Sequence, residues 1–390
     1  MNIKNILLGL GLGIMGLQAT SQELVRPVIT GAPFLQIVPD ARAGGMAEIG
    51  VASLPDAYSQ YHNPAKFLFF GEESNGIGLS YIPQFQGYAN DIFHANAAYY
   101  QQLNERSVIS GSLTYFSFGR IEVEEEIGGE VVNQGSFVPN EMAIDLSYSL
   151  KLSENYGMSV SGRYIRSNII NNRSRESVEY RAANAIAVDI SGYYVSALPE
   201  DRENMWSLGF NFKNLGSKLS YSDEEDSAYP LPANVRLGGG YHIMSGQNDV
   251  LSFYGEVMKF LVNSTDDEGN LPGRSAAAGW FNSFTDAPGG FSEELKEVIF
   301  SVGSEYNYKD ILRLRTGFIT QSKEKGNLNH LTFGGGIAYE RFNFDVAYQN
   351  PLGDNSGFKR NDVFKLSLSI DLNYRSPSQS KENPVAVNFK

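Results

Sequence analysis

The sequence predicts an all-β protein: a 14-stranded antiparallel transmembrane β-barrel of the outer-membrane type with an N-terminal hatch, or plug. Three observations predict this fold. An apolar leader marks the chain for export. After residue 75, fourteen segments carry an apolar side chain at every second position. The connections between these segments alternate between short turns and long loops, which is typical of outer-membrane barrels.

The N-terminal leader has the features of a secretory signal peptide over residues 1–21. Lys4 supplies its positive charge, and the apolar stretch 6–17 is shorter than the roughly 20 residues that a membrane-spanning helix needs. Positions 19–21 fit a small-x-small cleavage site, which makes Gln22 the expected mature N-terminus. The alternative is an uncleaved anchor or a buried helix. Because no later segment is apolar for 18 residues, strands would have to cross the membrane.

The predicted hatch, residues 22–74, is punctuated by glycine and proline and lacks the strand pattern. Gly44 and Gly45 allow close packing or a positive φ angle. Asn63 and Pro64 are expected to interrupt a short helix, because a residue before proline is pushed out of the α region.

Two charged residues of the hatch, Asp40 and Arg42, are the polar groups of most interest. We expect them to tie the plug to charges on the barrel wall, with a stabilising role favoured over a ligand contact. The Asn63 side chain is expected to hydrogen-bond a turn that Pro64 fixes, a structural role first and a gating role second.

The barrel prediction, residues 75–374, rests on alternation of period 2, and many of its segments are about as long as the ~9–11 residues that cross a bilayer. The predicted strands are 76–84, 92–103, 106–120, 140–152, 156–170, 181–197, 203–215, 231–243, 249–262, 296–308, 311–322, 328–340, 341–350 and 363–374. The inward polar side chains are expected to form an ion-pair network in the lumen, with a substrate path as the alternative; they include Asp145, Asp189, Arg313, Arg315, Asp345 and Asp371.

The lengths of the connections separate a membrane barrel from a soluble β-sandwich. Connections after even-numbered strands are mostly tight turns, whereas those after odd-numbered strands are generally long, with 85–91 and 323–327 as exceptions. A soluble sandwich has no reason to sort its loops in this way. We therefore expect an outer-membrane barrel with both termini on the periplasmic side. The polar tail, 375–390, is expected to be a flexible periplasmic segment, with a docking peptide as the alternative.

The longest connection, 263–295, is the best candidate for a partner contact. It carries four aromatic residues, Trp280, Phe281, Phe284 and Phe291. Exposed aromatic side chains on a loop often mark an interface. The alternative is that these rings fold back and close the mouth of the barrel.

The composition argues against several classes of function. The chain has no cysteine, which excludes disulfides, cysteine nucleophiles and cysteine-ligated zinc. Its formal net charge is −13, and no cluster of Lys and Arg marks a nucleic-acid-binding face. The four histidines are scattered, without a catalytic or metal-binding motif. We therefore expect no enzymatic activity, no cofactor, no metal site and no nucleic-acid partner.

The hatch motif carries a family resemblance. A fourteen-stranded barrel preceded by the tripeptide Asn63-Pro64-Ala65 resembles the FadL family of outer-membrane proteins, whose hatch carries an NPA motif. The tripeptide alone is weak evidence. Together with the runs APFLQIVPD, PDARAGGM, GVASLPDA and SQYH, it resembles the PorV family, the FadL-type outer-membrane component of the type IX secretion system of Bacteroidetes-type bacteria.

The resemblance implies a non-enzymatic role in protein secretion. Members of this family bind the large translocon barrel of the system, accept cargo proteins through their C-terminal signal domains, and pass them to an attachment complex with a PorU-type sortase. Outer-membrane lipid and lipopolysaccharide are the implied surroundings. The alternative function is a FadL-type channel for fatty acids or other hydrophobic molecules. A lipopolysaccharide-modifying enzyme and a soluble secreted β-protein are weaker alternatives.

Overall fold

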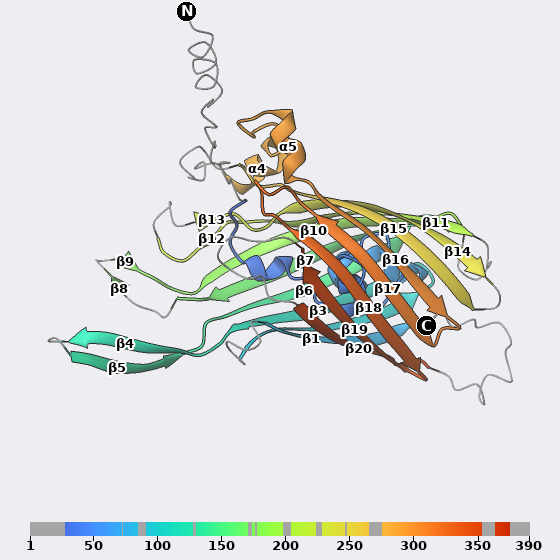
Figure 1. Ribbon diagram of the computed structural model, residues 1–390, viewed down its shortest axis with the longest axis horizontal. Helices are drawn as coiled ribbons and strands as arrows, with labels where there is room; N and C mark the ends of the chain where they lie inside the picture. The colour runs from blue at the N-terminus through green and yellow to red at the C-terminus, as the bar shows by residue number, and fades with distance from the viewer. Residues whose placement is uncertain are drawn as a thin grey trace, which may run out of the picture.

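The computed structural model describes residues 28–71, 73–84, 91–127, 130–170, 174–175, 178–197, 204–223, 228–245, 248–264, 275–352 and 363–374. The predicted signal peptide and the polar tail lie outside the described residues. Figure 1 shows the chain as a tilted barrel with its longer connections at one end.

Within these ranges, fourteen antiparallel strands form a closed barrel, which confirms the predicted fold. The barrel closes because β1 pairs with β20, where Leu79 lies opposite Leu368. The strands in order are β1 (Asn75–Pro83), β2 (Ile92–Asn104), β3 (Ser107–Phe118), β6 (Asn140–Lys151), β7 (Tyr156–Asn168), β10 (Ala183–Val195), β11 (Met205–Gly216), β14 (Asn234–Ser245), β15 (Asp249–Phe260), β16 (Ile299–Tyr308), β17 (Leu312–Thr320), β18 (Asn329–Tyr339), β19 (Phe342–Pro351) and β20 (Val363–Asp371).

The strands turn their apolar side chains outward and their polar side chains inward. On β6, Leu146 is 70% exposed, while its neighbours Asp145 and Ser147 are buried in the lumen. This is the reverse of a water-soluble protein and suits a wall that faces lipid. No helix in the described part of the chain is long and apolar enough to cross a membrane.

The longer connections gather at one end of the barrel, which we call the long-loop end; the other is the short-turn end (Figure 1). Three connections form two-stranded hairpins there: β4 (Ile121–Ile127) with β5 (Glu130–Phe137), β8 (Ser174–Arg175) with β9 (Val178–Glu179), and β12 (Leu219–Ser220) with β13 (Ala228–Tyr229). The connection from β15 to β16 forms two helices, α4 (Ala276–Asn282) and α5 (Phe291–Glu297).

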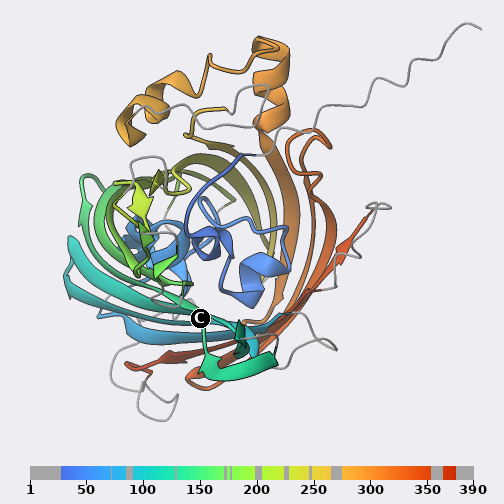
Figure 2. The same cartoon turned by 90° about the vertical axis from the view of Figure 1, so that its left-hand side faces the viewer.

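The N-terminal segment fills the lumen with short helices (Figure 2). They are η1 (Pro33–Gln36), α2 (Ala41–Gly44), α3 (Ser59–His62) and η2 (Pro64–Phe69). The helix break expected at Asn63 and Pro64 is present, since α3 ends at His62 and η2 begins at Pro64.

The hatch runs the length of the barrel. Val28 packs against the apolar cluster around Phe260 and Ile319, and the Gly31 amide donates to the Pro230 carbonyl at 2.8 Å, so the described chain begins at the long-loop end. It then passes through the lumen to β1, which starts at the short-turn end. The expected mature N-terminus, Gln22, and the C-terminal tail both lie outside the described residues.

Candidate functional site

Asp40 organises the hatch internally. Its Oδ1 accepts a hydrogen bond from the Ala43 amide at 2.7 Å and so caps α2, while its Oδ2 lies 2.7 Å from His62 Nε2 on α3. The carboxylate is fully buried. Burial alone would raise the pKa of Asp40, but His62 and the Ala43 amide lower it to about 2. Asp40 therefore joins two hatch helices through its own ion pair with His62, and the wall cation Lys365 on β20 attracts its carboxylate without forming a direct pair with it.

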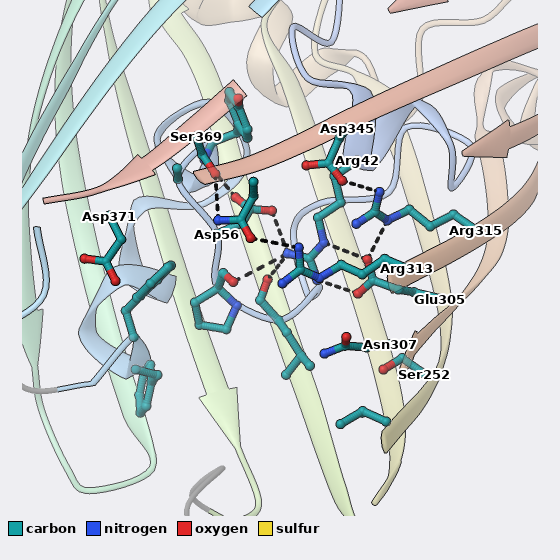
Figure 3. Close-up of a pocket in the computed structure, with 18 of the residues that line it drawn as sticks. Arg42, Asp56, Ser252, Glu305, Asn307, Arg313, Arg315, Asp345, Ser369 and Asp371 are labelled. Atoms are coloured by element: carbon teal, nitrogen blue, oxygen red, sulfur yellow. Dashed lines mark hydrogen bonds and ion pairs between the residues drawn. The ribbon is translucent and has the colours of Figure 1, made fainter. Parts of the chain in front are cut away.

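Arg42 does reach the wall. Its Nε and Nη2 donate to the two carboxylate oxygens of Glu305 on β16, at 3.0 and 2.7 Å, and its Nη1 pairs with Asp56 of the hatch at 2.7 Å. Arg315 on β17 pairs with the same Glu305 at 2.6 Å and with Asp345 at 2.6 Å. Figure 3 shows these side chains converging; we call Arg42, Glu305, Arg315 and Asp345 the hatch clasp.

The two glycines let the hatch approach the wall. A Cβ atom on Gly45 would lie 2.7 Å from the Cα of Gly334 on β18, and one on Gly44 would lie 2.8 Å from the Lys365 side chain on β20. The φ angle of Gly45 is −76°, so its need for glycine comes from close packing and not from a left-handed backbone.

The Asn63-Pro64-Ala65 motif joins the other side of the hatch to the wall. Asn63 Oδ1 caps η2 by accepting from the Ala65 amide at 3.1 Å, and its Nδ2 donates to the Gly192 carbonyl on β10 at 2.9 Å. The Pro64 carbonyl accepts from Ser149 Oγ on β6 at 3.0 Å. The amide oxygen of Asn63 caps η2, and its amide nitrogen contacts the wall. An ionised aspartate could not make both contacts, because its side chain has no hydrogen-bond donor.

The lumen ion pairs follow the sequence expectation in part. Asp145 and Asp189 both pair with Arg163 on β7, and Arg315 pairs with Asp345. Arg163 was missed, although its position in an alternating strand with Ser161 and Ile165 could have marked it as inward. Glu256 on β15 is also new: it accepts the Gly50 and Val51 amides of the hatch at 2.9 and 3.0 Å. Nothing in the sequence around Glu256 indicates this contact.

The hatch lies between two cavities. The cavity at the short-turn end encloses about 1060 Å³, part of it open to solvent, and its lining includes the hatch clasp, Arg313, Asp371, Tyr100 and Phe70 (Figure 3). The cavity at the long-loop end encloses about 980 Å³, again partly open. Apolar side chains line it, Met258, Phe260, Ile299, Ile319 and Leu328 among them, above a polar floor that includes Glu48, Arg236 and Lys365.

Three of the four aromatic residues of the longest connection lie on its outer surface. Phe281, Phe284 and Phe291 are 78%, 49% and 76% exposed, so these rings do not close the barrel mouth. Trp280 is partly buried and lines a small cavity with Leu261. Residues 265–274 of this connection lie outside the described chain.

Ion pairs hold α5, the second helix of this connection, against the barrel. Lys259 at the end of β15 pairs with Glu294 at 2.8 Å and also with Glu297, while Lys325 pairs with Glu293 at 2.7 Å and Glu297 at 3.0 Å. The three glutamates of α5 are buried, although they are the charged face of the helix. We call residues 275–298 the overhang. Among the described residues, no group of three or more His, Asp or Glu is placed to hold a metal ion.

The comparison with protein families decides the identity. The model of the family described as "Type IX secretion system protein PorV" matches residues 19–267. The chain belongs to the PorV family. This membership, with the barrel, makes it an outer-membrane β-barrel of a transport protein family and not an enzyme. No match was found among curated proteins.

Solved structures show which barrel this PorV-family chain resembles. The Pseudomonas putida toluene transporter TodX is 14% identical, and the alignment covers 87% of this chain and 99% of TodX with a TM-score of 0.52. A TodX monoaromatic hydrocarbon channel mutant, deltaS2, gives 13% identity, 86% and 99% coverage and a TM-score of 0.51. A Pseudomonas aeruginosa FadL homologue is 10% identical over 89% of this chain and 99% of its own, with a TM-score of 0.45. The likeness to TodX extends to the fold alone.

Proposed function

We propose that this PorV-family protein binds the type IX translocon barrel, accepts cargo through its C-terminal signal domain, and passes the cargo to an attachment complex with a PorU-type sortase. Membership of the PorV family is the observation that carries this proposal. Family membership makes the protein a component of the type IX secretion system, but it does not identify the translocon, cargo or sortase contacts. The contacts of the hatch and the overhang support the rest.

The hatch clasp favours a carrier or adaptor over an open conduit. Arg42 and Glu305 are both buried and join the hatch to the wall with two hydrogen bonds. Separating such a pair would leave an uncompensated buried charge, which costs about 3–5 kcal/mol. A second set of contacts, at Asn63 and Glu256, holds the hatch to β10 and β15. Partner binding is therefore assigned to the outer surface of the protein.

The overhang is the proposed contact with the translocon. Buried ion pairs fix its position, so little conformational entropy remains to be lost when a partner binds. Its exposed rings, Phe281 and Phe291, belong to the aromatic class that is enriched at protein interfaces.

The test is co-purification from mild detergent with mass spectrometry of the captured proteins. Phe281→Ala combined with Phe291→Ala is expected to reduce the captured translocon about tenfold or more, since a hot-spot truncation costs about 2 kcal/mol or more. Tyr339→Ala is the matched control, because Tyr339 is an aromatic residue 71% exposed on the opposite, short-turn end. Unchanged capture by the double variant would remove the overhang from the proposal.

A second candidate function is a FadL-type channel for fatty acids or other hydrophobic molecules. The long-loop cavity favours it, because Met258, Ile299 and Ile319 offer an apolar wall above the charged groups Arg236 and Lys365. Native mass spectrometry of protein incubated with a fatty acid tests binding. Ile319→Arg is expected to abolish a bound fatty acid, whereas Ile144→Arg, on the outer wall, should leave it in place. Absence of any bound fatty acid in the unaltered protein would reject this candidate.

A further inference from the structure

The cavity at the short-turn end, which we call the short-turn cavity, faces the periplasm, because short turns lie on that side of outer-membrane barrels. It encloses about 1060 Å³, part of it open to solvent. Ligand-binding sites in proteins are of similar size, roughly 300–1,000 Å³. The overhang and the long-loop cavity lie at the opposite end of the barrel, so neither of them accounts for this space.

Part of the lining of the short-turn cavity is apolar and aromatic. Phe69 ends η2 and Phe70 follows it, while Tyr100 comes from β2. The ring centroids of Phe70 and Tyr100 lie 5.1 Å apart. Leu54 and Pro55 of the hatch add further apolar surface. Such a lining favours a ligand with apolar or aromatic side chains.

The polar part of the lining has little charge to offer a ligand. Three arginines and four carboxylates line the short-turn cavity. Arg42 and Arg315 together hold three of these carboxylates in ion pairs. A bound anion would meet the carboxylates, and a bound cation would meet the three guanidinium groups. The cavity therefore favours an uncharged ligand.

Two buried polar atoms of this lining have no hydrogen-bond partner among the described residues (Figure 3). Arg315 donates from Nε to Glu305 and from Nη1 to Asp345, both at 2.6 Å, which leaves its Nη2 without an acceptor. Asn307 donates from Nδ2 to Asp310 at 2.8 Å, which fixes the orientation of the amide and leaves its Oδ1 without a donor. Buried polar groups without partners are costly, so each of these atoms marks a place where a ligand group would be stabilised.

A peptide main chain offers the complementary pair of groups. Arg315 Nη2 needs an acceptor, and Asn307 Oδ1 needs a donor. Arg315 lies opposite Glu305 in the strand register, so the two positions are about two residues, or roughly 7 Å, apart along the wall. In an extended peptide, the N–H and C=O of one residue point to the same side. Such a residue therefore carries the groups that both atoms need. A fatty acid is a poorer fit, because its carboxylate adds a negative charge and has no donor for Asn307.

The chain itself contains a peptide of this kind in its tail. Residues 383–389 have the sequence NPVAVNF, which carries no charged side chain. Val385, Val387 and Phe389 stand at every second position, a pattern typical of an extended segment with one apolar face.

The segment 383–389 is also within reach of the short-turn cavity. Asp371, the last residue of β20, belongs to the lining of the cavity. Eight residues, 375–382, separate Tyr374 from the segment, and eight extended residues span up to about 26 Å. The tether also gives the segment a high effective concentration at the cavity.

We propose that residues 383–389 bind in the short-turn cavity as an extended peptide. Its main chain accepts a hydrogen bond from Arg315 and donates one to Asn307, and its apolar side chains pack against Phe70 and Tyr100. The tail then closes the periplasmic end of the lumen, below the hatch. This inference goes beyond the proposed function, because it involves neither the overhang nor any contact with the translocon.

Disulfide cross-linking tests the proposal in the full-length protein, which has no cysteine of its own. Ala57 of the hatch lines the cavity, whereas Arg341 is exposed in the turn before β19, where its carbonyl accepts from the Asp371 amide at 2.8 Å. Each is changed to cysteine together with Val387→Cys, and the linked peptides are measured by mass spectrometry. We expect about tenfold more linkage of Val387→Cys to Ala57→Cys than to Arg341→Cys, because binding raises the local concentration. Equal linkage, or more linkage to position 341, would overturn the proposal.

An added peptide, acetyl-NPVAVNF-amide, tests the cavity by native mass spectrometry. A variant truncated after Tyr374 is expected to bind this peptide about tenfold or more tightly than the full-length protein, in which the tail competes. Equal binding to both proteins would overturn the tail as the occupant and point to a peptide of a separate periplasmic protein. Binding to neither protein, or binding of decanoate in place of the peptide, would overturn the site itself.

A further variant tests the assigned hydrogen bond. In the truncated protein, Asn307→Leu is expected to weaken binding of the added peptide about tenfold, because it leaves a peptide N–H without an acceptor. Asn140→Leu is the matched control, since Asn140 begins β6 at the long-loop end and should leave binding unchanged. Equal binding by the two variants would contradict the role of Asn307. A heat-modifiable gel shift confirms that each variant forms the barrel.

Discussion

The hatch and the overhang are held to the barrel by the same kind of interaction but orient their apolar residues in opposite directions. In the hatch, Arg42 reaches Glu305 on the wall, and the rings of Phe67 and Tyr58 are buried. In the overhang, the glutamates of α5 turn toward Lys259 on β15 and Lys325 in the β17–β18 connection, and Phe291 is exposed. Buried charge pairs thus set where each element sits, and the direction of the aromatic side chains determines whether it fills the lumen or offers a contact surface.

Removing Glu305 is expected to have the largest effect, because it should loosen the hatch and leave the overhang in place. Glu305→Ala would leave Arg42 and Arg315 without their shared carboxylate in a buried site, which is expected to cost about 3–5 kcal/mol. The loss of stability should appear as a lower melting temperature in detergent and as proteolysis of residues 28–74, while the overhang remains resistant to proteolysis. Arg42→Met combined with Glu305→Met should be milder than Glu305→Ala, since Arg42 no longer brings a charge to the site, Arg315 keeps Asp345, and only Asp56 loses its ion pair. Equal losses would show that the clasp does not depend on charge compensation.

A second, smaller effect concerns close packing in the hatch. Gly45→Ala would place a Cβ atom 2.7 Å from the Gly334 backbone, so the hatch or β18 must shift, at a cost of about 1–3 kcal/mol. Gly255→Ala is the control, because nothing lies within 4 Å of the position its Cβ would occupy. Thermal melting in detergent compares the two variants. Similar melting temperatures would mean that the hatch adjusts freely, which would weaken the view of it as a fixed plug.

The barrel could be predicted from the sequence because its signals are local. Alternation is visible within one strand, and connection lengths can be counted along the chain; both depend on neighbours in sequence. The clasp could not be predicted, since Arg42 and Glu305 are 263 residues apart and many inward charges compete as partners. The same reason explains why Asp40 was expected to pair with a charge on the wall, whereas its direct partner is His62 of the hatch. No local pattern in the sequence indicates that the hatch enters the lumen from the long-loop end.

The overhang could be predicted from the sequence only in part. Its four aromatic residues were visible in the sequence, but the outward orientation of Phe281, Phe284 and Phe291 was not. In α5, the pattern Phe-Ser-Glu-Glu-Leu-Lys-Glu would ordinarily place Phe291 and Leu295 in the core and the glutamates in water. Lys259 at the end of β15 and Lys325 in the β17–β18 connection reverse that orientation by giving the glutamates buried partners. Since these lysines lie on other elements, the helix sequence alone favours the opposite orientation.

Acid should affect the hatch through Asp40, whose pKa is lowered to about 2. A lowered pKa in the folded protein means that the ionised carboxylate contributes stability above its unfolded pKa of about 3.9, and that this contribution falls as the pH drops toward 2. The contribution amounts to about 2 kcal/mol. Asp40→Asn keeps a residue that can cap α2 but cannot ionise. Melting temperatures between pH 5 and pH 2 should fall more steeply for the unaltered protein than for Asp40→Asn, and parallel curves would contradict the assignment.

The smallest effect is expected where an ion pair of the overhang is exposed to water. Lys296 and Glu324 are 39% and 22% exposed, so their attraction is screened and is worth about 0–1 kcal/mol. Lys325, whose side chain is 2% exposed, holds Glu293 and Glu297 in a buried site. Lys325→Met should therefore release α5 to proteolysis and lower translocon capture, whereas Lys296→Met should change both very little. If the two variants behave alike, burial of the charges does not fix the overhang, and its rigidity must come from the helix contacts themselves.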